Sequence, residues 1–168
     1  ELGVVVSGGT FSIDHQYLDD NPTGTLSDTF SVNVRLNDDD LGSDVDSVLL
    51  TVDNVDPSVT FSLPGSVDEG SLATVTITGV VDPGTLDTHA FKYDVYKNGV
   101  LFATSGVFVG ATTFYFTPDD QDPGFTWSVD VQAMDDDGGL SAVVSHSLTV
   151  VDVAPTVFIT SLTSPIDE

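Results

Sequence analysis

The chain has 168 residues and a formal net charge of -24, because 27 acidic residues face only three fixed cations. Such a charge argues against nucleic acid as a partner, which needs a basic face, and against insertion into or binding to an anionic membrane. The sequence has no cysteine, which excludes disulfides and thiolate metal sites.

Apolar and polar residues alternate along most of the chain, and Gly, Pro, Asn and Asp interrupt the alternation at short intervals. This pattern is typical of strands with one buried face, so we expect an all-β protein. The Asn98-Gly99 pair indicates a tight hairpin, since both residues tolerate positive φ. In chain order, the expected strands are 9–17, 28–37 and 45–53, followed by a set of seven, A to G: 58–63, 72–79, 90–97, 100–105, 111–117, 125–134 and 141–151.

One stretch of the sequence occurs twice. Asp38-Asp39-Asp40 and Asp135-Asp136-Asp137 both open a carboxylate-rich turn, and each is followed by a strand and an exit through a proline, Pro57 or Pro155. Asp68-Glu69 recurs as Asp167-Glu168 on nearly the same spacing. A period of roughly 98 residues has the size of an immunoglobulin-like sandwich, so we expect tandem immunoglobulin-like or cadherin-like β-sandwich repeats.

The repeat predicts three segments. Residues 1–55 are expected to be the C-terminal half (strands E to G) of a first repeat, 56–153 a complete second repeat, and 154–168 the first strand of a third. A window cut from a longer tandem array would explain both ends. Phe30 corresponds to Trp127 on strand F, and both are expected to anchor a core.

The acidic residues are almost all aspartate, and they cluster between strands. Strand parity assigns the A–B turn, the E–F loop and Asp152 to one end of the second repeat. It assigns the B–C loop, the F–G turn, the linker 53–56 and the preceding Asp19-Asp20 to the other end. Each junction between repeats is therefore expected to gather carboxylates from several loops.

Converging carboxylates require a counter-charge. Two of them about 4 Å apart repel by roughly 4 kcal/mol at an effective dielectric near 20, and several would exceed the usual stability margin of a small domain. Calcium takes six to eight oxygen ligands in irregular sets and fits best, whereas the three histidines show no spacing typical of transition-metal ligands. We expect several Ca²⁺ ions, with the ligands Asp19, Asp20, Asp38, Asp40, Asp53, Asn54, Asp56, Asp68, Glu69, Asp82, Asp87, Asp119, Asp120, Asp122, Asp135, Asp137 and Asp152.

Two other readings of the acidity stay open. Asp is common in turns simply because its side chain binds nearby backbone NH groups. A surface adapted to high salt would also be acidic. Asp39 and Asp136, at the middle of each triplet, should point away from their neighbours and are weaker candidates.

The punctuation Asp135-Asp136-Asp137-Gly138-Gly139, with its exit through Pro155, resembles that of the tandem PKD-like and cadherin-like repeats of large bacterial and archaeal surface proteins. The linker Asp53-Asn54-Val55-Asp56-Pro57 is similar to the one by which cadherins bind calcium between domains. The resemblance implies a secreted or cell-surface, calcium-stiffened spacer or adhesive array such as an S-layer component, an adhesin stalk or a filament.

No catalytic constellation is evident, and we expect no enzymatic activity; the expected partners are neighbouring repeats of the same protein. One alternative is glycan binding on exposed aromatics, for which a planar row would be needed; the candidates are Tyr93, Tyr96, Phe102, Phe108, Phe114, Tyr115 and Phe116. Another is a homopolymer in which the strand at 156–162 is donated to the first repeat of another copy.

Overall fold

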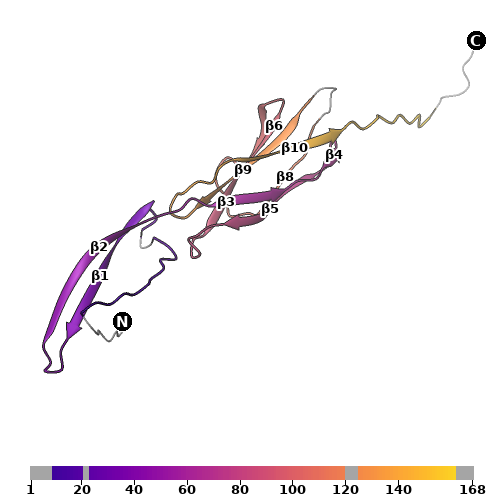
Figure 1. Ribbon diagram of the computed structural model, residues 1–168. Helices are drawn as coiled ribbons and strands as arrows, with labels where there is room; N and C mark the ends of the chain where they lie inside the picture. The colour runs from indigo at the N-terminus through magenta and orange to yellow at the C-terminus, as the bar shows by residue number, and fades with distance from the viewer. Residues whose placement is uncertain (1–8, 21–22, 120–124, 162–168) are drawn as a thin grey trace, which may run out of the picture.

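A two-stranded hairpin and an eight-stranded sandwich lie end to end (Figure 1). This computed structural model describes residues 9–20, 23–119 and 125–161, and within these ranges it contains ten strands and no helix. The prediction of an all-β protein is therefore confirmed for the described residues. None of these residues belongs to a helix that is long and apolar enough to cross a membrane.

The sandwich consists of a five-stranded and a three-stranded sheet. The larger sheet has the order β4-β10-β9-β6-β7 and the smaller one the order β3-β5-β8. All pairs are antiparallel except β4 with β10, which run parallel. The strands are β3 (Ser58–Ser62), β4 (Ser66–Asp68), β5 (Ala73–Val81), β6 (His89–Lys97), β7 (Val100–Thr104), β8 (Thr113–Phe116), β9 (Trp127–Asp135) and β10 (Val144–Val151).

This strand order is that of an immunoglobulin-like sandwich, with strands A, B and E in one sheet and C, F and G in the other. The seven strands predicted between residues 58 and 151 are confirmed within a few residues. The strand predicted as D is β7, which pairs with β6 through the turn at Asn98 and Gly99, both at positive φ. The short β4 was not predicted; it forms because the chain crosses after β3 to the edge of the other sheet.

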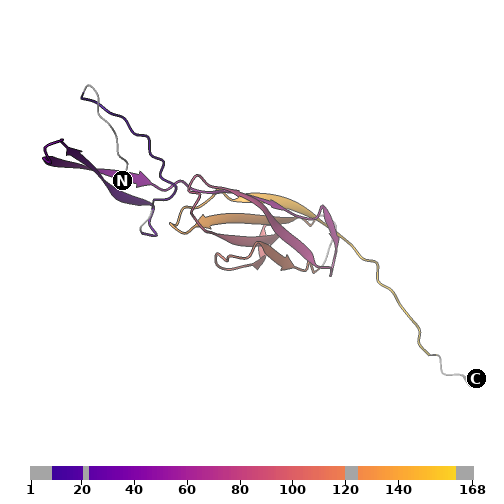
Figure 2. The same ribbon diagram turned by 90° about the horizontal axis from the view of Figure 1, so that it is seen from below.

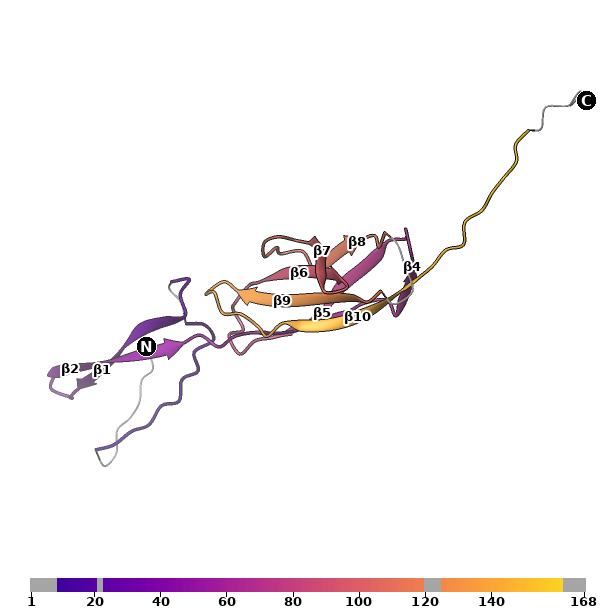
Figure 3. The ribbon, with the colours of Figure 1, turned by 90° about the horizontal axis from the view of Figure 1, so that it is seen from above.

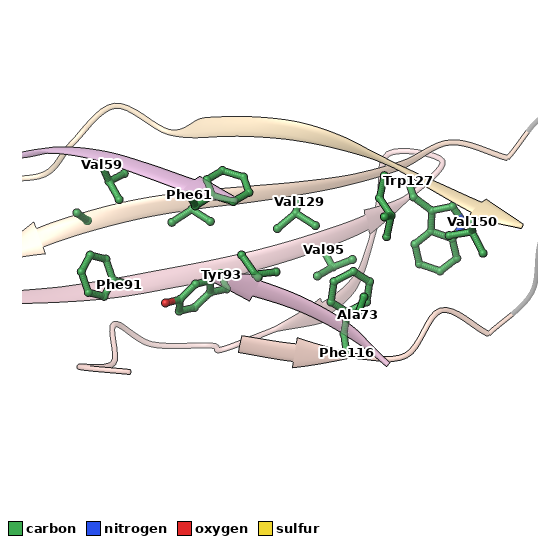
Figure 4. Packing of buried hydrophobic residues seen from close by; sticks show 14 residues of the cluster. Val59, Phe61, Ala73, Phe91, Tyr93, Val95, Phe116, Trp127, Val129 and Val150 are labelled. Atoms are coloured by element: carbon green, nitrogen blue, oxygen red, sulfur yellow. The ribbon is translucent and has the colours of Figure 1, made fainter. Parts of the chain in front are cut away.

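The core lies between the two sheets (Figure 4). Strand β9 shows most clearly how the alternation of the sequence forms this core, since its residues alternate strictly between buried and half-buried positions. Trp127, Val129 and Val131 of β9 are buried, and Tyr93 from β6 is fully enclosed beside them. The Trp127 ring also meets Phe102 edge to face, with the centroids 4.9 Å apart. The prediction that Trp127 anchors the core is confirmed.

The hairpin pairs β1 (Ser27–Asn37) with β2 (Ser43–Asp53) along their whole length. Phe30 lies opposite Leu50, and its ring is 4.9 Å from that of Tyr17. Phe30 is only half-buried, because no second sheet of described residues covers its face of the hairpin. The strands predicted at 28–37 and 45–53 are thus confirmed, but Phe30 anchors a contact with Tyr17 rather than an enclosed core.

The strand predicted at 9–17 is wrong. These residues form no strand, and Phe11 and Ile13 are about half exposed. The physical reason is the lack of a partner: the corresponding strand of the sandwich, β8, pairs with β5, and no segment of 9–57 corresponds to β5. The alternating pattern is present, but an isolated strand cannot satisfy its backbone groups.

At the opposite end of the sandwich, residues 152–161 leave β10 as an extended segment without strand pairing (Figures 2 and 3). Val157, Phe158 and Ile159 are all more than three-quarters exposed. The assignment of 154–168 to a third repeat, and the alternative of strand donation to another copy, stay predictions. Residues 162–168, which include Asp167 and Glu168, lie outside the described residues.

Candidate metal centre

Four segments meet where the hairpin joins the sandwich, and we call this place the junction. They are residues 17–20, the linker 53–56, the β5–β6 loop (82–88) and the β9–β10 turn (135–140). Figure 3 shows β9 running toward the hairpin, so that its C-terminal turn faces the incoming linker. These are the segments that strand parity assigned to one end of the second repeat.

Two groups of three aspartates form within the junction. In each group, one carboxylate oxygen from every residue lies within 4.8 Å of the others. Asp82, Asp87 and Asp135 form one group, and Asp19, Asp87 and Asp137 form the other. Asp87 belongs to both, so five carboxylates from three separated segments are drawn together.

Asp135 is held in place by the backbone and by the linker. Its Oδ1 accepts hydrogen bonds from the backbone NH groups of Asp137 (3.1 Å) and Gly139 (2.7 Å). Its Oδ2 accepts one from Nδ2 of Asn54 at 2.8 Å, a contact that spans the two parts of the chain. In the same linker, Oδ1 of Asp56 accepts the NH of Leu140 at 3.2 Å. Hydrogen bonds of Asp135, Asn54 and Asp56 therefore hold the β9–β10 turn against the linker, and the sequence assigned these three residues to the same end of the sandwich.

Asp82 is fixed from within its own loop. Its Oδ1 accepts the backbone NH of Gly84 at 3.0 Å, and its Oδ2 lies 2.8 Å from Nε2 of His89. The Asp82 side chain is only 4% exposed. Asp136 is exposed, accepts the NH of Thr88 at 2.7 Å, and belongs to neither of the two groups. Its assignment as a weaker ligand candidate stays a prediction.

Two carboxylate oxygens at the junction are buried without any hydrogen-bond partner. They are Oδ2 of Asp20 and Oδ1 of Asp87. Asp20 is only 3% exposed as a residue. A buried carboxylate oxygen without a donor is costly, since desolvation is not compensated. Such oxygens fit a cation, which satisfies several of them at once.

Crowding shifts the protonation of two of these groups. Burial, followed by the charges of Asp82 and Asp19, raises the pKa of Asp87 from 3.8 to about 6. Burial and a hydrogen bond with Asp20 raise the pKa of Asp137 from 3.8 to about 7. Without a cation, the junction therefore holds protons that isolated aspartates would release.

The site has room for an ion but no fixed positive charge of its own. A cavity of about 80 Å³ is lined by residues 17–20 except Leu18, by 52–55, and by Pro83, Gly84 and Asp87. Such a volume can hold several waters or a hydrated ion. The three basic side chains are elsewhere: Lys92 pairs with Asp94, Lys97 pairs with Asp119, and Arg35 lies in β1.

Two glycines make space for the carboxylates, and the sequence pattern did not single them out. A Cβ at Gly84 would lie 2.7 Å from Cγ of Asp87. One at Gly139 would lie 2.5 Å from Nδ2 of Asn54 and 2.9 Å from Oδ1 of Asp56. All three distances are too short for real side chains. The sequence could have indicated these positions only through glycines that lie near aspartates, and this combination is also common in ordinary turns.

Gly84 permits a test that leaves every charge in place. We expect Gly84→Ala to weaken calcium binding about tenfold, or roughly 1.4 kcal/mol, because the new methyl group displaces the Asp87 carboxylate. Isothermal titration calorimetry measures this affinity. Gly65→Ala is the matched control, since a Cβ there would meet no atom within 4 Å. Equal affinities for the two variants would contradict the placement of Asp87 in the site.

The remaining predicted ligands belong to neither group, and some of them lie far from the junction. Asp53 ends β2 at the cavity wall, whereas Asp38 and Asp40 lie at the far tip of the hairpin. Oδ1 of Asp38 accepts the NH of Gly42 at 2.6 Å, which is the turn-stabilising role of aspartate. No group of three metal-ligating side chains among the described residues includes Asp38 or Asp40.

At the opposite end of the sandwich, the β4–β5 turn, the end of β10 and the start of the β8–β9 loop lie in contact. The NH of Val153 donates to Oε1 of Glu69 at 3.0 Å, and the NH of Gly70 donates to the carbonyl of Pro118 at 2.8 Å. Asp119 forms an ion pair with Lys97 at 2.8 Å. Asp68 and Asp152 are exposed there, and Asp120 and Asp122 lie outside the described residues. A metal role for this end stays a prediction.

The aromatic side chains that the sequence offers for glycan binding differ in exposure. Tyr93 and Phe116 are buried, and Phe114 stacks on Tyr93 at 5.3 Å. Tyr115 is 55% exposed on β8, as its position in the alternation predicted, while Tyr96 lies on β6 of the other sheet. The glycan-binding alternative stays a prediction.

The strand order of the two sheets places this fold among the immunoglobulin-like β-sandwiches. A comparison with known protein families finds no match for this sequence, and a comparison with curated proteins finds none either. Among solved structures, the chain is similar to the CARDB domain of the PF1109 protein from Pyrococcus furiosus, whose crystal structure is a complex with di-metal ions. The identity is 20%, the match covers 57% of this chain and 88% of that one, and the TM-score is 0.36.

Two further solved structures are similar. The fibronectin(III)-like modules of CbhA from Clostridium thermocellum are 16% identical, over 78% of this chain and 66% of that one, with a TM-score of 0.43. The solution structure of the same CARDB domain is 21% identical, over 56% of this chain and 94% of that one, with a TM-score of 0.31.

Proposed function

We propose that this chain is a non-enzymatic structural module of an extracellular surface array, in which calcium at the junction fixes the hairpin against the sandwich. The division into repeats at 1–55, 56–153 and 154–168 belongs to this proposal. One observation carries it: the two aspartate groups and the partnerless oxygens of Asp20 and Asp87 lie where the segments before the sandwich meet it. A cation at this place stabilises the contact that determines the angle between the two parts.

Calcium suits the site better than the alternatives do. All the donors are carboxylate or amide oxygens from irregular loops, and calcium accepts such sets at variable geometry. Magnesium demands a near-ideal octahedron and retains its waters, which five crowded carboxylates from three segments do not favour. His89 is engaged with Asp82, so the described residues present no imidazole cluster for zinc or copper.

The mechanical role follows from the position of the site. Hydrogen bonds of Asn54 and Asp56 tie the linker to the β9–β10 turn, and Asp19 and Asp20 bring carboxylates of the preceding segment close to Asp137 of the same turn. Neutralising their charge removes the repulsion that opposes these contacts. A flexible joint between two β units then becomes a stiff one, which is what a spacer or stalk needs.

The absence of native cysteine makes the stiffness directly measurable. Spin labels on Ser47→Cys in β2 and Ser147→Cys in β10, both exposed positions, report the distance between hairpin and sandwich. We expect a narrow distribution of label-to-label distances in CaCl₂ and a broad one after chelation with EDTA. Identical distributions in the two conditions would contradict a calcium-stiffened joint.

A further inference from the structure

The two aspartate groups differ in which parts of the chain they need. Asp82 and Asp87 lie in the β5–β6 loop and Asp135 ends β9, so all three belong to the sandwich, and we call them the inner group. Asp19, Asp87 and Asp137 include one residue from the segment before the hairpin, and we call them the bridging group. The inner group can therefore exist without any contact between the two parts, whereas the bridging group requires that contact.

Two partnerless carboxylate oxygens lie at these groups, one in the residue that they share and one beside the bridging group. Oδ1 of Asp87 is buried without a partner in the residue that both groups share. Oδ2 of Asp20 is also without a partner, in a residue that is only 3% exposed. Asp20 follows Asp19 directly, hydrogen-bonds to Asp137, and lines the same cavity as Asp87. One partnerless oxygen thus lies in the shared ligand and the other at the bridging group.

The charges also suit two ions better than one. The five aspartates of the two groups and Asp20 carry six negative charges, and Asp53, Asp56 and Asp136 add further negative charge at the same junction. One divalent cation leaves about four negative charges on the six aspartates, whereas two cations leave about two negative charges. The backbone and amide NH donors to Asp135 offset part of this remainder.

We propose, building on the calcium site above, that the junction binds two calcium ions in order, and that the second ion is the latch between the two parts. The first ion occupies the inner group and belongs to the sandwich. It neutralises Asp82 and Asp135 and orients Asp87 toward the bridging group. The second ion binds when Asp19 and Asp20 dock, so that its occupancy and the docked state stabilise each other.

Titration calorimetry with CaCl₂ on the whole chain tests this order, using Asp19→Asn, Asp82→Asn and the control Asp14→Asn. Asp14 is exposed in the same segment and carries the same charge. We expect two ions for the unmodified chain and for Asp14→Asn. Asp19→Asn should retain one ion with an affinity within about threefold of the tighter site. Asp82→Asn should weaken both ions, each by about tenfold or more.

The spin-label pair adds a readout that a purely local ion would not change. With calcium bound, Asp19→Asn should show the broad distances of the chelated protein although one ion is still present. Loss of both ions in Asp19→Asn, retention of both, or a single ion in the unmodified chain would overturn the ordered two-ion latch. If the unmodified chain binds no calcium at all, the proposed function itself fails, which is a different result.

Discussion

Asp87→Asn should raise the melting temperature in the absence of metal and abolish the further rise that calcium produces. In the metal-free protein, burial first, and then the charges of Asp82, Asp19, Asp136 and Asp135, raise the pKa of Asp87 to about 6. Replacing it by the neutral amide removes this repulsion, and we expect a gain of about 1–2 kcal/mol in the free energy of unfolding. For a domain of this size, that is roughly 5–15 °C in Tm.

Calcium should make the unmodified chain the more stable of the two proteins. At a free concentration 100 times the Kd, one bound ion stabilises the folded state by about 2.7 kcal/mol, and a second ion adds to this. The unmodified chain should therefore gain about 10 °C or more, whereas Asp87→Asn, which lacks the shared ligand of both groups, should gain little. Differential scanning calorimetry with EDTA and with CaCl₂ measures both effects.

Asp40→Asn is the control for this experiment. Asp40 is exposed at the hairpin tip, so its replacement removes the same charge away from the junction. We expect its response to calcium to match that of the unmodified chain. If Asp87→Asn lowers the metal-free Tm, or if it keeps the full calcium response, Asp87 does not act as a crowded metal ligand.

The metal-free protein should be more stable at pH 5 than at pH 8. Asp87 and Asp137 have folded-state pKa values of about 6 and about 7, against 3.8 for ordinary aspartate. Between about pH 4 and pH 7 the folded state therefore binds more protons than the unfolded state, and its stability falls as the pH rises. The contribution of these two groups is complete below about pH 4 and is lost above about pH 7.

Calcium should cancel this trend, because it binds the deprotonated carboxylates and replaces the protons. We expect the difference in Tm between pH 5 and pH 8 to amount to several degrees in EDTA and to vanish or change sign in CaCl₂. Calorimetric titrations at pH 6.5 in buffers of different ionisation enthalpy should show proton release on calcium binding. Asp137→Asn should flatten the metal-free profile; a profile that is unchanged by this substitution would refute the assignment to Asp137.

Much of the fold followed from the alternation of apolar and polar residues. It predicted the strands of the sandwich within a few residues, because side chains on a half-buried strand must alternate between core and solvent. Strand parity then predicted that Asp19, Asp82, Asp87 and Asp135 meet, since loops joined by an even number of strands return to the same end. The same alternation failed at 9–17, where no strand among the described residues pairs with it.

The sequence by itself thus determined the all-β class, the ends of the sandwich and the gathering of the aspartates. Only the tertiary structure decided which of them converge, that Asp87 is shared by two groups, and that Asp20 and Asp87 each bury an oxygen without a donor. It also decided the pairing of His89 with Asp82 and the need for glycine at position 84. The physical reason is that periodicity encodes which face of a strand is buried, whereas the contacts of a loop side chain depend on segments distant in the sequence.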